Sequence, residues 1–283
     1  MSRGFALLLA LLFTALLSPV VRAADREFTT SDGIHLHYIE QGHGHTIVLV
    51  PGWTMPAWIW DAQIADFARH YRVIAFDPRA QGDSEASRDG YEPLRRGQDI
   101  AELIATLGPE RVLLAGWSLG VLDALAYVHT HGDARLAGLV LIDNSVGEEP
   151  APTAGPRHAG SARPIGREAR MRLFVHGMFA RPQPAAYLDR LTAACLRTPE
   201  AAADALLNYP EPRSFWKEAV YATARPVLYV VTPRFAGQAE NLRRHHPTAE
   251  AVVMTGVGHA LFVDDPARFD ALLGDFIRRR VWP

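Results

Sequence analysis

The stretch from Arg111 to His129 constrains the fold of this chain more than any other. Val112–Ala115 is a short apolar run typical of a buried strand, and Leu119–His129, rich in Ala and Leu and free of Pro, predicts a helix. The motif Gly-Trp-Ser-Leu-Gly lies between them and places Ser118 at the apex of a sharp turn. Such a turn needs small neighbours, which the two glycines provide. The Ser118 hydroxyl would project above the sheet, and the helix N-terminus behind it would favour developing negative charge.

The other apolar segments predict an α/β fold. Phe28–Ile39 alternates around Asp32-Gly33, which indicates a β-hairpin. Further strands are expected at Thr46–Val50, Tyr71–Phe76, Leu139–Ile142, Pro226–Val231 and Ala251–Met254, and helices at Ala57–Arg69, Gly97–Leu107, Ala239–His245 and Pro266–Arg280. Because strands alternate with helices, we expect a mostly parallel, doubly wound sheet of about eight strands with helices on both faces.

The alternation of strands and helices is interrupted after Ser145. Gly147–Gly160 is rich in Pro, Gly and Ala and predicts a loop. Four helices without an intervening strand are then expected, at Gly166–Ala180, Pro184–Arg197, Pro199–Asn208 and Ser214–Ala224. Helices inserted in this way predict a lid over the carboxyl edge of the sheet, formed by residues of about 147–224.

The beginning of the chain has the pattern of a signal peptide. Arg3 is followed by an apolar region, Phe5–Leu17, and the small residues around Ala23 predict cleavage after that residue. The apolar run of about a dozen residues is short for a membrane-spanning helix, which needs about 20, although an uncleaved anchor is the alternative. We therefore expect an exported protein, periplasmic or secreted, whose mature residues 24–283 form one domain and do not bind a membrane. Cys195, the only cysteine of the chain, is expected to be a small core residue.

The charge of the chain is nearly balanced. Its 283 residues carry a formal net charge of −2 and no strongly basic block. Nothing in this composition favours nucleic acid as a partner. No H-E-x-x-H motif, Cys/His cluster or glycine-rich phosphate loop occurs, so neither a metal nor a cofactor is expected. The oligomeric state stays open.

His259 is the leading candidate for a base that acts on Ser118. A serine hydroxyl is a weak nucleophile and needs a base within hydrogen-bond distance, together with a group that orients the base. His259 follows the last predicted strand in a glycine-rich loop, so it should overhang the edge of the sheet to which Ser118 points. Other histidines, at 35 and 37 on the hairpin and at 245 and 246 at a helix end, are poorer candidates.

With these motifs in order, the chain resembles the α/β-hydrolase family from about Phe28 to its C-terminus. Gly116–Gly120 matches the nucleophile elbow of that family, and Gly256–His259 matches its histidine loop. Asp77–Ser84 resembles the D-x-R-G-x-G-x-S turn, with Ala80 in place of the usual glycine.

The resemblance also implies an oxyanion hole. Pro51-Gly52-Trp53 resembles the H-G-x loop of the family, with Pro51 in place of histidine. Two backbone N–H groups would then hold the oxyanion, one from Leu119 beside the serine and one from Trp53.

The acid of the expected triad is less evident. The usual acid of the family lies after the strand that is here Val227–Val231, but the following loop, Thr232–Gln238, contains no Asp or Glu. Part of the family instead uses the end of the preceding strand, which in this sequence is Asp143. An Asp that closes a buried strand must find hydrogen-bond partners, and His259 is one candidate. Glu240 and Asp123 are weaker candidates for the same role.

The resemblance implies a serine-nucleophile, esterase-like enzyme that hydrolyses carboxylic esters or lactones through an acyl-enzyme. Dehalogenases and epoxide hydrolases of this fold carry an aspartate at the elbow, so Ser118 disfavours both. The substrate pocket is expected to include Trp53, Met55 and Trp117, with Phe174 and Met178 contributed by the lid. Such walls would favour an apolar or aromatic acyl group.

Two alternatives remain open from the sequence. The elbow Gly116–Gly120 resembles that of carboxylesterases that act on pimeloyl esters. The strand pattern also resembles that of the cofactor-free non-haem chloroperoxidases, so a chloroperoxidase, perhydrolase or oxygenase reaction is one alternative. The other alternative is a non-catalytic relative that binds a small ligand, because the usual acid is missing from the loop after the Val227–Val231 strand.

Overall fold

The computed structural model describes residues 23–152 and 165–283. The predicted signal peptide therefore lies outside the described residues except for Ala23, as does most of the loop predicted at Gly147–Gly160. No helix of the described residues combines the length and the apolar character that a bilayer crossing requires.

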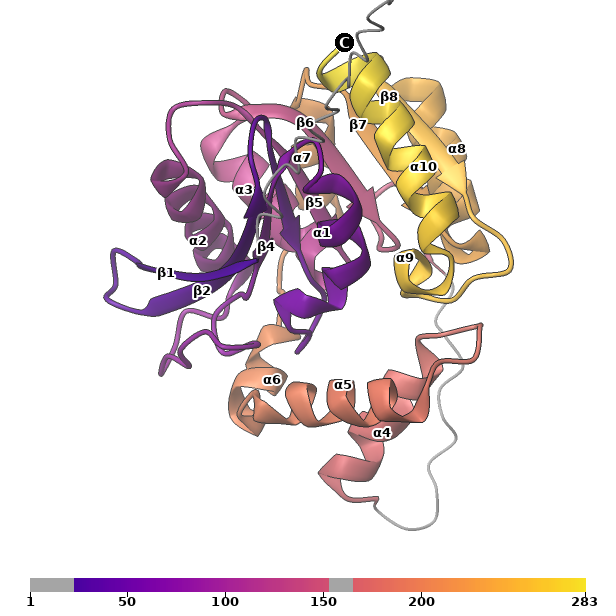
Figure 1. The fold of residues 1–283 in the computed structure, drawn as a ribbon. Helices are drawn as coiled ribbons and strands as arrows, with labels where there is room; N and C mark the ends of the chain where they lie inside the picture. The colour runs from indigo at the N-terminus through magenta and orange to yellow at the C-terminus, as the bar shows by residue number, and fades with distance from the viewer. Residues whose placement is uncertain (1–22, 153–164) are drawn as a thin grey trace, which may run out of the picture.

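The centre of the molecule is an eight-stranded sheet (Figure 1). Its strands follow the order β1-β2-β4-β3-β5-β6-β7-β8. The first two are antiparallel to their neighbours, and all others are parallel. This confirms the predicted mostly parallel sheet. The strands are β1 (Ala24–Thr29), β2 (His35–Gly42), β3 (Thr46–Val50), β4 (Arg72–Phe76), β5 (Val112–Trp117), β6 (Leu136–Ile142), β7 (Val227–Val231) and β8 (Ala249–Val253).

Helices cover both faces of the sheet, because alternate side chains of each central strand point to opposite sides. Val48 and Val50 of β3 join one buried cluster, and Ile47 and Leu49 join the other. The first cluster contains α2 (Pro93–Thr106), α3 (Leu119–His131) and α8 (Ala236–His245), and the second contains α1 (Asp61–Phe67) and α10 (Pro266–Phe276). Both faces are thus buried, which is the usual condition of a parallel sheet.

Some element boundaries differ from the prediction. Helix α2 begins at Pro93, four residues before the predicted start, because proline suits the first turn of a helix. The 3₁₀ turn η1 (Ala57–Trp60) precedes α1, another, η2 (Pro233–Phe235), precedes α8, and a π-helical turn, η3 (Ile277–Val281), follows α10. The short helix α9 (Leu261–Asp264), directly after the histidine loop, was not predicted.

The helical insertion between β6 and β7 divides into two parts. It consists of α4 (Arg167–Gly177), α5 (Ala185–Arg197), α6 (Glu200–Leu206) and α7 (Arg213–Ala222). Helices α4, α5 and α6 lie together beyond one end of the sheet in Figure 1, and we call these three the cap. Helix α7 instead packs against α3, and its residues Ala219 and Val220 are buried in the same core cluster.

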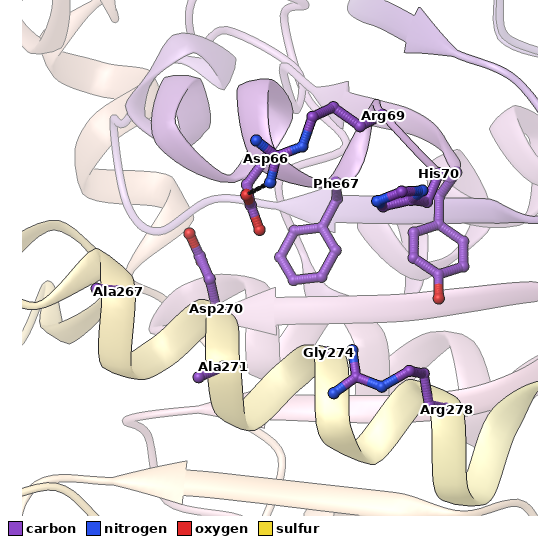
Figure 2. Close-up of a pocket in the computed structure, with 10 residues that line it drawn as sticks. Asp66, Phe67, Arg69, His70, Ala267, Asp270, Ala271, Gly274 and Arg278 are labelled. Atoms are coloured by element: carbon purple, nitrogen blue, oxygen red, sulfur yellow. Dashed lines mark hydrogen bonds and ion pairs between the residues drawn. The ribbon is translucent and has the colours of Figure 1, made fainter.

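A groove of about 650 Å³ separates α1 from α10 on the surface (Figure 2). Asp270 of α10 projects toward α1, and its carboxylate accepts a hydrogen bond from the Gln63 amide at 2.9 Å. Burial raises the pKa of Asp270 to about 6; the negative charge of Asp66 adds to this rise, and the Gln63 amide opposes it. Asp270 therefore holds its proton more tightly in the folded chain than in the unfolded chain.

This pKa shift predicts a pH-dependent stability. An acid whose pKa is raised by folding weakens the fold as the pH rises from about 4 through 6, where the carboxyl ionises at a cost. Asp270→Asn keeps the acceptor oxygen for Gln63 and removes the charge. We expect this variant to have a higher melting temperature than the wild type at about pH 8, with the gain shrinking toward pH 4.5. Thermal unfolding across this range checks it. Asp275→Asn, on the exposed side of the same helix, is the control, and a gain independent of pH would contradict the prediction.

Candidate active site

Ser118 lies at the strained turn between β5 and α3. Its backbone has φ 54° and ψ −120°, an unusual conformation for a residue with a side chain. Two hydrogen bonds hold the turn: the Ser118 N–H donates to the Ile142 carbonyl at 2.9 Å, and the Asn144 amide donates to the Ser118 carbonyl at 2.8 Å. The strain is thus maintained by the neighbouring strand end at β6.

The two glycines of the motif are required by close approach of the backbone. A Cβ at Gly116 would lie 2.1 Å from the carbonyl oxygen of Gly120. A Cβ at Gly120 would lie 2.5 Å from the carbonyl oxygen of Val50, at the end of β3. The strand, the turn and the helix can pack this closely only because these two positions carry no side chain.

Ser118, His259 and Asp143 form a continuous hydrogen-bonded array. The distance from His259 Nε2 to Ser118 Oγ is 2.8 Å, and that from His259 Nδ1 to Asp143 Oδ2 is also 2.8 Å. The three side chains come from the ends of β5, β8 and β6, and they meet at the carboxyl edge of the sheet. The arrangement can pass a proton from a serine hydroxyl to an imidazole whose orientation a carboxylate fixes.

Asp143 is buried, and the carboxylate oxygen that does not contact His259 accepts two hydrogen bonds. Asp143 Oδ1 accepts hydrogen bonds from the Thr232 N–H at 2.7 Å and from the Thr232 hydroxyl at 2.8 Å. Thr232 directly follows β7, at the start of the loop in which the sequence offered no acid. The loop after β7 therefore provides two hydrogen-bond donors to Asp143 Oδ1, so Oδ2 is left to contact His259. Thr232 was not among the predicted site residues, although its position directly after β7 was the signal for this role.

The two weaker candidates for the acid lie elsewhere. Asp123 is buried in α3 and forms an ion pair with Arg96, with 2.7 Å between Arg96 Nε and Asp123 Oδ1. Glu240 pairs with Arg243 and Arg244 on the exposed side of α8. Both carboxylates are occupied by arginine, and within the described residues only Asp143 contacts the His259 ring through a carboxylate.

The loop that carries His259 is held by two side chains. The Trp117 indole donates to the His259 carbonyl at 2.8 Å. Asp264 of α9 accepts from the Gly258 N–H at 2.6 Å and from the Ala180 N–H at 2.8 Å, so it ties the loop to the segment after α4. The contribution of Asp264 was not predicted, because it depends on a helix that the sequence pattern did not indicate.

The loop after β3 lies directly against the elbow. A Cβ at Gly52 would come within 3.0 Å of the Ser118 Cβ. Among the hydrogen bonds of the described residues, the N–H groups of Trp53 and Leu119 have no acceptor. Leu119 is the first residue of α3, where N–H groups lack an intrahelical partner. Both groups are therefore available for an anionic oxygen near Ser118.

A cavity of about 620 Å³ opens over the Ser118 hydroxyl and His259. Its apolar walls come from both the sheet side and the cap, and they are Trp53, Leu119, Leu122, Phe174, Leu207, Trp216 and Phe235. Polar groups line it as well, from Asn144, Ser145, Tyr209, Glu211, Arg213 and Arg234. The cavity is large enough for a small organic molecule with an apolar portion.

Three residues expected in the pocket, Trp117, Met55 and Met178, do not line this cavity. Trp117 is 1% exposed, and its ring packs edge-on against Trp60 and Phe262 in the core. Met55 is completely buried, 3.8 Å from the sulfur of Cys195. The elbow directs Ser118 toward the cavity, so the adjacent Trp117 is turned to the opposite side. Met178 is 2% exposed and belongs to the same buried cluster as Trp117 and Met55. The expectation that Trp117, Met55 and Met178 form pocket walls is therefore corrected.

The motif Asp77–Ser84 forms a structural centre beside this region. Asp77 is buried and accepts hydrogen bonds from His37 at 2.7 Å and from the N–H groups of Ala57 and Asp83 at 2.5 and 3.1 Å. Among the described residues, His37, Asp77 and Asp83 lie close enough to share a metal ion, but the oxygens of Asp77 already have these partners. Ala80 adopts φ 64°, the conformation that a glycine adopts most readily.

The fold and this array together define a class of protein. The sequence model of a protein family described as the alpha/beta hydrolase family matches residues 47–272. The chain belongs to the α/β hydrolase family, as the sequence motifs predicted.

The relatives of this chain within the family are named for different activities. A non-heme haloperoxidase of Rhodococcus erythropolis is 36% identical over 115 residues, which cover 40% of this chain and 42% of that protein. A pimeloyl-[acyl-carrier protein] methyl ester esterase of Pectobacterium atrosepticum is 34% identical over 111 residues, 39% of this chain and 41% of that protein. The matched segments thus span about two-fifths of these relatives. The solved structure of RhEst1, an esterase from Rhodococcus sp., has a TM-score of 0.77 and 27% identity, and the match covers 90% of this chain and 99% of that chain.

The contacts of Asp143 predict a stability effect at Thr232. Thr232→Val keeps the shape of the side chain but removes one donor to a buried carboxylate, so we expect the free energy of unfolding to fall by about 1–3 kcal/mol. Thr232→Ser keeps the hydroxyl and should stay close to the wild type. Urea unfolding of the three proteins measures this. Equal stability of the valine variant and the wild type would show that the hydroxyl contributes nothing.

Proposed function

We propose that this protein is an exported serine hydrolase that cleaves carboxylic esters or lactones through an acyl-enzyme. The observation that carries the proposal is the hydrogen-bonded array of Ser118, His259 and Asp143, with 2.8 Å at each contact. Esterases among the relatives and the solved structures support the same reaction class. Export rests on the sequence pattern of Met1–Ala23 alone.

The geometry suggests the following course of reaction. Ser118 Oγ attacks the carbonyl carbon, and its proton passes to His259 Nε2. The carbonyl oxygen becomes negative and is held by the N–H groups of Trp53 and Leu119. Asp143 keeps His259 in the tautomer that accepts the proton and stabilises the imidazolium that results.

The second half of the reaction reverses these roles. When the tetrahedral intermediate collapses, the carbon–oxygen bond to the alcohol breaks, and His259 donates its proton to the departing oxygen. In a lactone this alcohol stays attached to the acyl group. Water then attacks the acyl carbon and gives its proton to His259. When the acyl–Oγ bond breaks, His259 passes this proton to Ser118 Oγ, and the acid is released. The apolar walls of the cavity favour an apolar or aromatic acyl group.

Labelling of the serine tests the nucleophile directly. A fluorophosphonate probe should label the wild-type protein covalently, and Ser118→Ala should abolish both the labelling and the hydrolysis of p-nitrophenyl esters, because the attacking oxygen is gone. Gel fluorescence and mass spectrometry of the labelled peptide measure this. Ser145→Ala, another serine at the cavity, is the matched control and should be labelled like the wild type. Equal labelling of wild type and Ser118→Ala would end the proposal.

The role of Asp143 predicts a kinetic effect with little loss of fold. In Asp143→Asn the amide can donate to His259 Nδ1, and this leaves the imidazole in the wrong tautomer to accept the serine proton. We expect kcat to fall by about 10²- to 10⁴-fold with a melting temperature close to that of the wild type. Ester kinetics with circular dichroism check this. Asp123→Asn is a poor control because its carboxylate is buried; Asp275→Asn, on the exposed side of α10, serves instead. Retained activity in Asp143→Asn would assign the role to another group.

A haloperoxidase or perhydrolase reaction is the second candidate, because the haloperoxidase of Rhodococcus erythropolis is similar to this chain. Such a reaction would use the same serine and cavity with peroxide in place of water. Halogenation of monochlorodimedone in the presence of peroxide and halide tests it. Halogenation faster than ester hydrolysis would favour this alternative, whereas ester turnover without halogenation would favour the hydrolase. Tight binding of a small ligand without any turnover would instead indicate a non-catalytic protein.

A further inference from the structure

The side chain of Trp53 connects the loop beside Ser118 to the cap. Its indole Nε1 donates a hydrogen bond to the Ala203 carbonyl of α6 at 2.7 Å. The same ring packs edge-on against Phe174 of α4, with 5.0 Å between ring centroids. Trp53 thus contacts two cap helices through its side chain, while its backbone borders the candidate nucleophile.

The carbonyl that receives this bond belongs to a helix end. Ala203 lies in the last turn of α6, where carbonyl groups lack an intrahelical donor. The N–H groups of Leu207 and Asn208 donate to the carbonyls of Asp204 and Ala205, so they do not serve Ala203. Helix α6 has only seven residues, and so short a helix needs tertiary contacts to persist. The Trp53 indole is one such contact.

The loop after β3, which contains Trp53, is also anchored to the α/β body. The Thr54 N–H donates to the Gln81 side chain, and the Ala57 N–H donates to Asp77 at 2.5 Å. Thr54 has φ 60°, so the backbone next to Trp53 is strained. The peptide between Gly52 and Trp53, which carries the Trp53 N–H, is held within the same loop, where its carbonyl accepts from the Met55 N–H at 3.2 Å. Trp53 is therefore attached to the α/β body through the backbone of its loop and to the cap through its side chain.

We propose that the Trp53 indole is a positioning group that couples the cap to the oxyanion hole. With its bond to Ala203 in place, the indole holds the Trp53 N–H toward the carbonyl oxygen of a substrate at Ser118. The inference rests on the proposed hydrolase function, in which that N–H stabilises the oxyanion. It adds that α6 takes part in the reaction through Trp53 without touching the substrate.

The test uses Trp53→Phe in the full-length protein, because phenylalanine keeps an aromatic ring at this position and removes the indole N–H donor. We expect kcat for p-nitrophenyl acetate to fall about 10- to 100-fold with little change in KM, since a misplaced oxyanion donor affects the transition state more than the bound substrate. Hydrogen–deuterium exchange should become faster in the amides of residues 200–207. The matched control is Trp58→Phe: Trp58 packs against Arg190 and Tyr187 of α5 and lies outside the cavity lining, so kcat and exchange in α6 should stay at wild-type values.

The first arm of a second measurement uses only the wild-type protein and so does not depend on the folding of a variant. If cap and oxyanion hole are coupled, the coupling is reciprocal. A phosphonate adduct on wild-type Ser118, which places an oxygen in the oxyanion hole, should therefore slow exchange in residues 200–207, and Trp53→Phe should lose this protection.

The outcomes separate this inference from the proposed function. Unchanged kcat in Trp53→Phe, a loss confined to KM, an equal kcat loss in Trp58→Phe, or unchanged exchange in α6 would each overturn the coupling. Absence of ester turnover and of Ser118 labelling in the wild type would overturn the hydrolase function, and with it the proposed role of the indole in the oxyanion hole.

Discussion

The buried carboxylate of Asp143 is the group on which the arrangement of the site depends. A carboxylate in so dry a place is tolerated only when hydrogen bonds satisfy its oxygens. Thr232 satisfies one oxygen with two donors, and His259 contacts the other at 2.8 Å. Asp143 thereby connects the ends of β6, β7 and β8. The orientation of the imidazole that faces Ser118 thus depends on contacts between residues that follow three different strands.

Backbone strain gathers at the same edge of the sheet. In the part of the chain that the structure describes, the residues other than glycine with positive φ are Thr54, Ala80, Ser118 and Asp143. Each follows one of four neighbouring strands, β3, β4, β5 or β6, by a few residues. Such conformations cost on the order of 1–3 kcal/mol each and persist only where the surroundings enforce them. The extensive core on both faces of the sheet supplies that enforcement, and it allows the carboxyl edge to hold groups in positions that a flexible loop could not maintain.

The cap meets this rigid edge through a small number of directed contacts. Trp53 bonds to α6, Asp264 bonds to the segment after α4, and Arg197 of α5 forms an exposed ion pair with Asp83 at 2.7 Å. Two of these three contacts involve residues in or beside the loops that surround Ser118. The helices that border the cavity and the loops around Ser118 are thus joined by the same contacts, so the position of the cap and the positions of these loops depend on each other.

The amino-acid sequence alone determined the α/β architecture and the places of Ser118 and His259, because apolar periodicity and glycine-bounded turns are local properties of the chain. It also indicated Asp143, although the identity of the acid depended on which strand end faces the histidine. The parts that only the tertiary structure decided are contacts between residues far apart in the chain: Thr232 with Asp143, Trp53 with Ala203, and the orientation of Trp117 into the core. Local pattern predicts which face of a strand is buried, but which partner a polar side chain meets depends on how separate strands and helices come together.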